Sequence, residues 1–211
     1  MSTEMKPAFA WCLALLALTA PLGARVLFET EYLAIQVDDT GAVQGLSDRV
    51  SGVDFLAPNQ PASLLSLRID GRFQAPSTMR QEAGAGTLTL RYGDAIEAVV
   101  LAEAKATHVT FEIVSLTSRE KADLAVWGPY PTTIGETIGE TVGVVRDDRF
   151  ALGIQALNLK TLGGYPTVEN DVMAGRGDAA QATKFGSVLQ AFTRDRSEDR
   201  TSQAHTSQKA T

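Results

Sequence analysis

The sequence predicts an all-β protein, an antiparallel two-sheet β-sandwich. Apolar and polar residues alternate over many short stretches, and Gly and Asp turns separate these stretches about every ten residues. Val, Ile and Thr are frequent within the stretches, and no segment has the longer period of an amphipathic helix. Two packed sheets would hide the apolar faces of such strands.

The individual strands follow from this alternation and from the turns between them. Asp39-Thr40-Gly41 separates the first two strands, and Asp70-Gly71 is a strong hairpin signal. Strands are predicted at 33–37, 43–48, 63–69, 72–73, 87–92, 96–104, 108–116, 124–127, 142–145, 150–157 and 184–192.

The N-terminal segment 1–24 is predicted to be a secretory signal peptide. An apolar run over 9–20 follows Lys6, precedes Pro-Leu-Gly-Ala, and is shorter than the roughly 20 residues that a transmembrane helix needs. We expect cleavage after Ala24, with Ala20 as the alternative. The protein would then be exported, periplasmic or extracellular, without a membrane anchor. The alternatives are that the apolar run is a retained membrane anchor or a buried apolar segment. Cleavage would also remove Cys12, the single cysteine, so that no disulfide or cysteine-based metal site remains.

The sandwich domain is predicted to cover 26–192. The segment 193–211 contains no large apolar residue and is rich in Ser, Thr, Gln and charge, which predicts a disordered polar tail and a possible truncation point. The formal net charge of −6 disfavours nucleic acid and anionic membranes as partners and is compatible with a neutral ligand such as a sugar, but its simplest interpretation is that it serves solubility alone.

Catalytic candidates are few. Glu136 and Glu140 could act as an acid and a base, but on an extended strand they would lie about 13 Å apart, more than glycosidases use. His108 is expected in the middle of a strand, opposite its apolar face. Neither a Ser-His-Asp set nor metal-ligand spacing can be assembled around it, and no metal or cofactor is predicted.

Other acidic residues are expected to have structural roles. Asp38, Asp39, Asp147 and Asp148 carry the oxygen ligands that calcium prefers, but no calcium-loop pattern surrounds them, so we interpret them as turn residues.

The segment Trp127-Gly128-Pro129-Tyr130-Pro131 offers a possible binding site. Gly and Pro predict a loop, in which Trp127 and Tyr130 could form a flat platform for sugar rings, with Tyr165 and Asn170 at its rim. The alternative is that Trp127 caps the core and Tyr130 stiffens the turn.

The run 32–48, the strand 107–113 with the following Trp127-Gly128-Pro129, and the strand 151–158 resemble a known domain. It is the galactose-mutarotase-like (supersandwich) N-terminal β-sandwich of secreted glycoside-hydrolase-type proteins. The resemblance covers residues 26–192 and implies a supersandwich fold and an association with carbohydrate. Mutarotase catalysis is not implied, because those enzymes use a Glu base with His partners and this domain has only His108.

These observations lead to one principal hypothesis and two alternatives. The principal one is a non-catalytic carbohydrate-associated module of an exported glycoside-hydrolase-type protein. The first alternative is a sugar epimerase or hydrolase that uses Glu136 or Glu140 with His108. The second is a structural module whose partner is a catalytic domain of a longer protein.

Overall fold

The computed structural model describes residues 25–82, 86–139, 143–158, 160–164 and 178–194. This part of the chain is all-β, with antiparallel sheets and a single 3₁₀ turn, η1 (Arg119–Lys121), so the predicted fold class is confirmed. It contains no helix long and apolar enough to cross a membrane. The predicted signal peptide and residues 195–211 of the predicted tail lie outside the described residues. The tail was predicted to begin two residues too early, because Thr193 and Arg194 belong to the last strand, β16 (Gly186–Arg194), and pair with Ala125 and Leu124.

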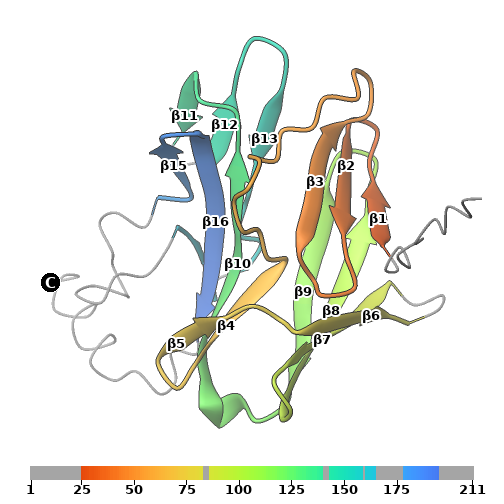
Figure 1. Cartoon of the computed structure of the whole chain (residues 1–211), viewed down its shortest axis with the longest axis vertical. Coiled ribbons are helices and arrows are strands. Elements are labelled where there is room, and N and C mark those ends of the chain that lie inside the picture. The colour runs from red at the N-terminus through yellow and green to blue at the C-terminus, as the bar shows by residue number, and fades with distance from the viewer. Residues whose placement is uncertain (1–24, 83–85, 140–142, 159, 165–177, 195–211) are drawn as a thin grey trace, which may run out of the picture.

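Two smaller sheets lie on one side of the molecule (Figure 1, right). The first has the order β1-β2-β3 and contains β1 (Val26–Glu29), β2 (Leu33–Val37) and β3 (Val43–Asp48). The second has the order β6-β7-β8-β9 and contains β6 (Thr78–Gln81), β7 (Thr87–Tyr92), β8 (Ile96–Ala104) and β9 (Val109–Leu116). Each is a meander in which neighbouring strands in the sequence pair with each other.

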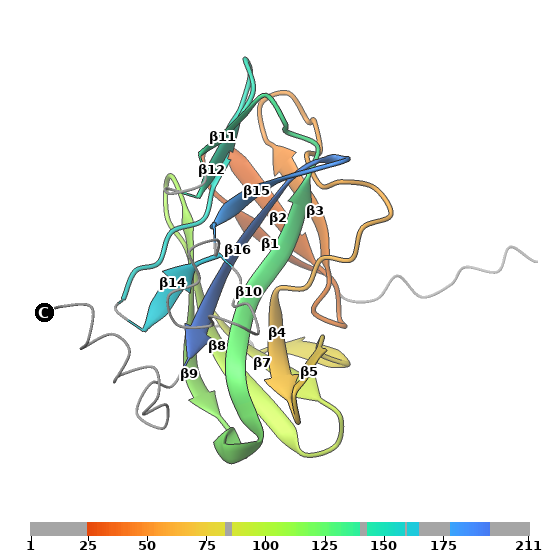
Figure 2. The same cartoon turned by 90° about the vertical axis from the view of Figure 1, so that its left-hand side faces the viewer.

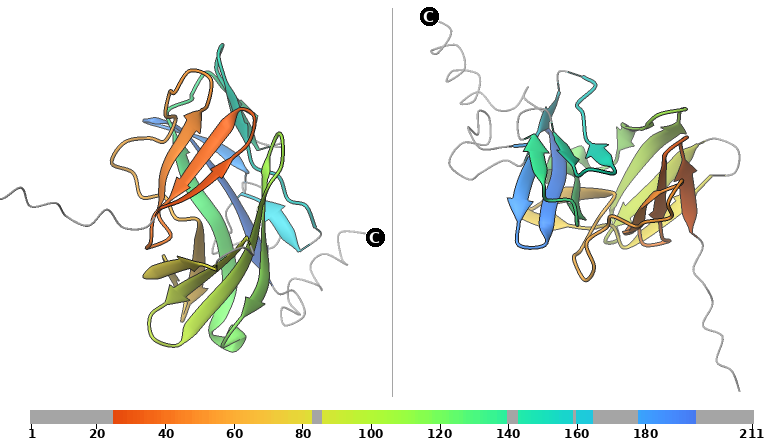
Figure 3. Two further views of the ribbon diagram at one scale, coloured as in Figure 1. Left: turned by 90° about the vertical axis from the view of Figure 1, so that its right-hand side faces the viewer. Right: turned by 90° about the horizontal axis from the view of Figure 1, so that it is seen from above.

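The largest sheet faces these two, as the view from above in Figure 3 shows. Its order is β14-β16-β10-β4-β5, with β15 also paired to β16. The strands are β4 (Leu65–Ile69), β5 (Arg72–Gln74), β10 (Ala122–Thr132), β14 (Thr161–Gly163), β15 (Ala180–Thr183) and β16 (Gly186–Arg194). A further small sheet, at one end of the molecule, consists of β11 (Thr137–Gly139), β12 (Val144–Arg146) and β13 (Ala151–Gly153).

The main core lies between the largest sheet and the two sheets that face it. It combines side chains from β2 and β3, from β7 and β8, and from β4 and β10. A second cluster joins Phe55 and Ile134 to the β11-β12-β13 sheet and to β15 and β16. A third cluster, Leu124, Val126 and Phe192, is buried on the opposite face of β10 and β16. Both faces of the largest sheet are therefore partly covered.

The prediction of a loop at 127–131 was wrong, because these residues belong to strand β10. The segment continues the strand through a β-bulge. Trp127 pairs with Ala191 and Tyr130 pairs with Leu189, so two residues of β10 lie between these pairs where β16 has one. Gly128 has a φ of 91°, which a glycine adopts easily. The Gly-Pro signal thus marks a bulge inside a strand rather than the end of one.

The proline at 131 is compatible with the strand because of its orientation. Its C=O accepts a hydrogen bond from the N–H of Ala57 at 3.0 Å, on the edge of β10 that faces away from β16. In a strand the N–H and C=O of one residue point to the same edge, so the missing N–H of Pro131 interrupts no bond to β16. Strand β4 pairs with β10 only as far as Trp127, which leaves this edge open to residues 55–57.

Candidate functional site

A groove with a volume of about 630 Å³ opens on the outer face of the largest sheet, across β10, β16 and β15. These three strands lie side by side in Figure 2. One row of residues crosses its floor, because Val188 of β16 pairs with Pro131 on one side and with Gln181 on the other. Residues from β10 and from the β15–β16 hairpin, more than 40 positions apart in the sequence, therefore contribute to one site.

The bulge in β10 determines which side chains face the groove. Before it, Leu124 and Val126 point to the outer face and Trp127 points to the main core. The extra residue reverses this alternation. Beyond the bulge Tyr130 packs inward, and Pro129 and Pro131 line the groove.

The groove has an apolar part and a polar part. Pro61, Pro129, Pro131, Val188 and Phe185 form the apolar part. Phe185 lies in the two-residue turn that joins β15 to β16, and its side chain is half-buried. The polar part consists of Gln60, Asp178, Gln181, Thr183 and Gln190. The groove thus places apolar surfaces beside amides, a hydroxyl and a carboxylate, which can donate or accept hydrogen bonds.

Trp127 and Tyr130 do not form the exposed platform that the sequence suggested. Trp127 is only 8% exposed, and its ring packs against Phe111 with the ring centroids 6.1 Å apart. The hydroxyl of Tyr130 donates to the C=O of Leu64 at 2.7 Å, and burial raises the pKa of this hydroxyl. A sugar could stack on neither ring without displacing core side chains.

The other predicted site residues are not brought together. Glu136 is exposed, just before β11. His108 is also exposed and lies in the turn before β9, so the prediction of a mid-strand position was wrong; the strand begins one residue later. Glu140, Tyr165 and Asn170 lie outside the described residues.

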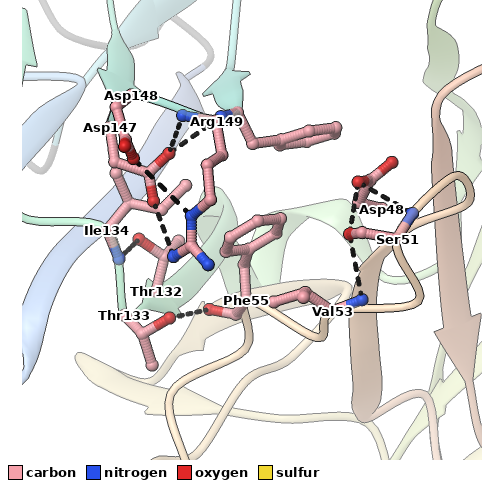
Figure 4. Close-up of polar contacts among 11 residues, drawn as sticks. Asp48, Ser51, Val53, Phe55, Thr132, Thr133, Ile134, Asp147, Asp148 and Arg149 are labelled. Atoms are coloured by element: carbon pink, nitrogen blue, oxygen red, sulfur yellow. Dashed lines mark hydrogen bonds and ion pairs between the residues drawn. The ribbon is translucent and has the colours of Figure 1, made fainter.

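The acidic turn residues bind their own backbone. The carboxylate of Asp147 accepts hydrogen bonds from the N–H groups of Arg149 and Phe150, which lower its pKa. Figure 4 shows the Arg149 guanidinium beside Asp147 and Asp148. In the same view Ser51 contacts Asp48, and its hydroxyl together with the N–H of Val50 lowers the pKa of Asp48.

Asp38 is used in the same way. It accepts hydrogen bonds from the N–H groups of Thr40 and Ala42 in the first turn, as expected for a turn residue. In the described part of the chain no three His, Cys, Asp or Glu side chains lie close enough to hold a metal ion.

Phe185 and Gln190 line the groove but were not predicted as site residues. A signal for Phe185 was present, because an aromatic residue in a two-residue turn next to a glycine has no core to pack into from that position. Nothing in the local sequence distinguishes Gln190 from a solvent-facing glutamine of an alternating strand.

Comparison with known proteins adds no relative: no protein-family model, curated protein or solved structure matches this chain.

Proposed function

We propose that the chain is a non-catalytic, carbohydrate-associated β-sandwich module of an exported glycoside-hydrolase-type protein, and that the groove across β10, β16 and β15 is its sugar site. The observation that carries this proposal is the groove lining. Phe185 and the prolines offer surfaces for the C–H faces of a sugar ring, and the amides of Gln181 and Gln190 offer both donors and acceptors to its hydroxyls.

A binding role is favoured over catalysis by the positions of the ionisable groups. Asp178 is the one ionisable side chain among the described groove residues, whereas glycoside cleavage uses a pair of carboxylates. Glu136 and His108, the described catalytic candidates, are exposed, precede strands of two different sheets, and do not line the groove.

The test is calorimetric titration of the protein against a panel of neutral oligosaccharides. We expect measurable binding to at least one of them, and an affinity about tenfold lower in Phe185→Ala, because the aromatic face is lost. Phe73→Ala is the matched control, since Phe73 is a 39% exposed phenylalanine on β5 outside the groove. Absence of heat across the panel, or equal effects of the two variants, would contradict the proposal.

A further inference from the structure

Gln190 combines burial with a side-chain amide that has no hydrogen-bonding partner among the described residues. It is 6% exposed, and its backbone is already satisfied: its N–H donates to Ala179 O and its C=O accepts from Gly164 N, both at 2.9 Å. Its side-chain amide forms no hydrogen bond with any residue that the structure describes. Buried amides are nearly always hydrogen-bonded, so this amide retains the capacity to bind a partner from outside the described residues.

The position of Gln190 directs its side chain to the groove. Side chains of a strand alternate between faces, so Gln190 shares a face with Val188, which also lines the groove, and with Phe192. The intervening Leu189 and Ala191 belong to the clusters on the opposite face. The unpaired amide is therefore available to a molecule bound in the groove.

The charge of the groove lining indicates which net charge a bound molecule can carry. Asp178 is acidic, and no Lys, Arg or His is among the described residues that line the groove. The chain as a whole carries a formal net charge of −6. A uronate or a sulfated sugar would place its anionic group beside Asp178, with no cation to pair with among the described lining residues, which is unfavourable.

Resting on the proposed function, we infer that the groove selects an uncharged sugar over its acidic counterpart through Asp178, and that the buried amide of Gln190 is the group that hydrogen-bonds a hydroxyl of the bound sugar. An amide presents one acceptor and one donor group, and a sugar hydroxyl can satisfy either. Asp178 accepts from a second hydroxyl. A site that hydrogen-bonds a hydroxyl in a buried position rejects ligands that cannot supply it, because its own polar group is then left unpaired.

The first arm of the test compares ligands. Oligosaccharides of glucose, mannose and galactose are titrated into the full chain, each beside the corresponding uronate oligosaccharide. We expect the best-bound neutral sugar to exceed its uronate by about tenfold or more, and the difference to shrink in Asp178→Asn. A uronate that binds as well as its neutral counterpart overturns the inference but leaves sugar binding intact. If neither kind binds, the proposed function itself fails.

The second arm tests Gln190. Gln190→Met keeps the length of the side chain and removes the amide, and Gln74→Met on the exposed strand β5 is the matched control. We expect Gln190→Met to weaken binding of the neutral sugar by about tenfold or more, with no decrease in the urea midpoint of unfolding, because an unpaired amide stabilises nothing. Unchanged binding overturns the inference. So does a decrease in the unfolding midpoint beyond that of Gln74→Met, because it would show that the amide has a structural partner.

Discussion

The hydroxyls of Tyr92 and Tyr130 donate to the carbonyl oxygens of two consecutive residues, the first residue of β4 and the residue before it. Tyr92 bonds to Leu65 O at 2.9 Å and Tyr130 bonds to Leu64 O at 2.7 Å. Burial raises the pKa of both hydroxyls above the ordinary value, and for Tyr92 the neighbouring Tyr130 adds to the effect. Both side chains thus belong to the main core as neutral hydrogen-bond donors.

These raised pKa values predict a loss of stability at alkaline pH. Above pH about 10 the tyrosines of the unfolded chain lose their protons while the two buried ones keep theirs. The unfolded state then binds fewer protons than the folded state, so the free energy of unfolding falls as the pH rises. We expect a smaller fall between pH 9 and 11 in the double variant Tyr92→Phe/Tyr130→Phe, measured by urea unfolding. At pH 8 each lost hydroxyl should cost about 0.5–1.5 kcal/mol. Parallel pH profiles of the two proteins would contradict the assignment.

At the scale of the element, the bulge of β10 is the feature that shapes the groove. A Cβ added at Gly128 would lie 2.8 Å from the backbone N of Tyr130 and 3.0 Å from the O of Leu189. Both neighbours are backbone atoms of the paired strands, so they cannot move aside as a flexible side chain would. The bulge therefore requires glycine for its positive φ and also for the space around it.

We expect Gly128→Ala to lower the free energy of unfolding by about 2–3 kcal/mol, because strain at the positive φ adds to the close contacts. The matched control is Gly52→Ala. Gly52 has a φ of 74° but no atom within 4 Å of the added Cβ, so only the backbone cost of about 1–2 kcal/mol applies. Chemical denaturation of both variants measures the difference. Equal losses would show that the contacts around Gly128 relax freely.

Strand β10 and the β7–β8 hairpin together show which elements can be predicted from the sequence. The ranges 87–92 and 96–104 agree with β7 and β8, because alternation and turn residues within one hairpin are local signals. The predicted strand at 150–157 forms only at Ala151–Gly153. The loop prediction at 127–131 failed because Gly and Pro signal a bulge as readily as a strand end. The groove could not be predicted either, since it depends on a pairing between β10 and β16 that leaves no local trace.

At the scale of the whole molecule, aromatic contacts join three sheets. Phe111 of β9 contacts Phe28 of β1 edge to face, with the centroids 5.4 Å apart, and it also contacts Trp127 of β10 at 6.1 Å. Tyr130 and Ile154 pack against both the main core and the second cluster. Side chains shared in this way couple the clusters, so that loss of one exposes the other.

This coupling predicts a single cooperative unfolding transition. Trp127 is the one tryptophan among the described residues, so Trp11→Phe leaves a fluorescence signal that reports on the main core alone. Far-ultraviolet circular dichroism reports on the strands of all four sheets. We expect the two urea midpoints to coincide, and Phe111→Ala to lower both by the same amount, equivalent to about 1–3 kcal/mol. Val114→Ala, at a 52% exposed position of the same strand, should change stability by less than about 0.5 kcal/mol. If the two midpoints separate only in the Phe111→Ala protein, Phe111 links sheets that otherwise unfold independently. If they already separate in the Trp11→Phe protein with Phe111 intact, the coupling through Tyr130 and Ile154 is contradicted.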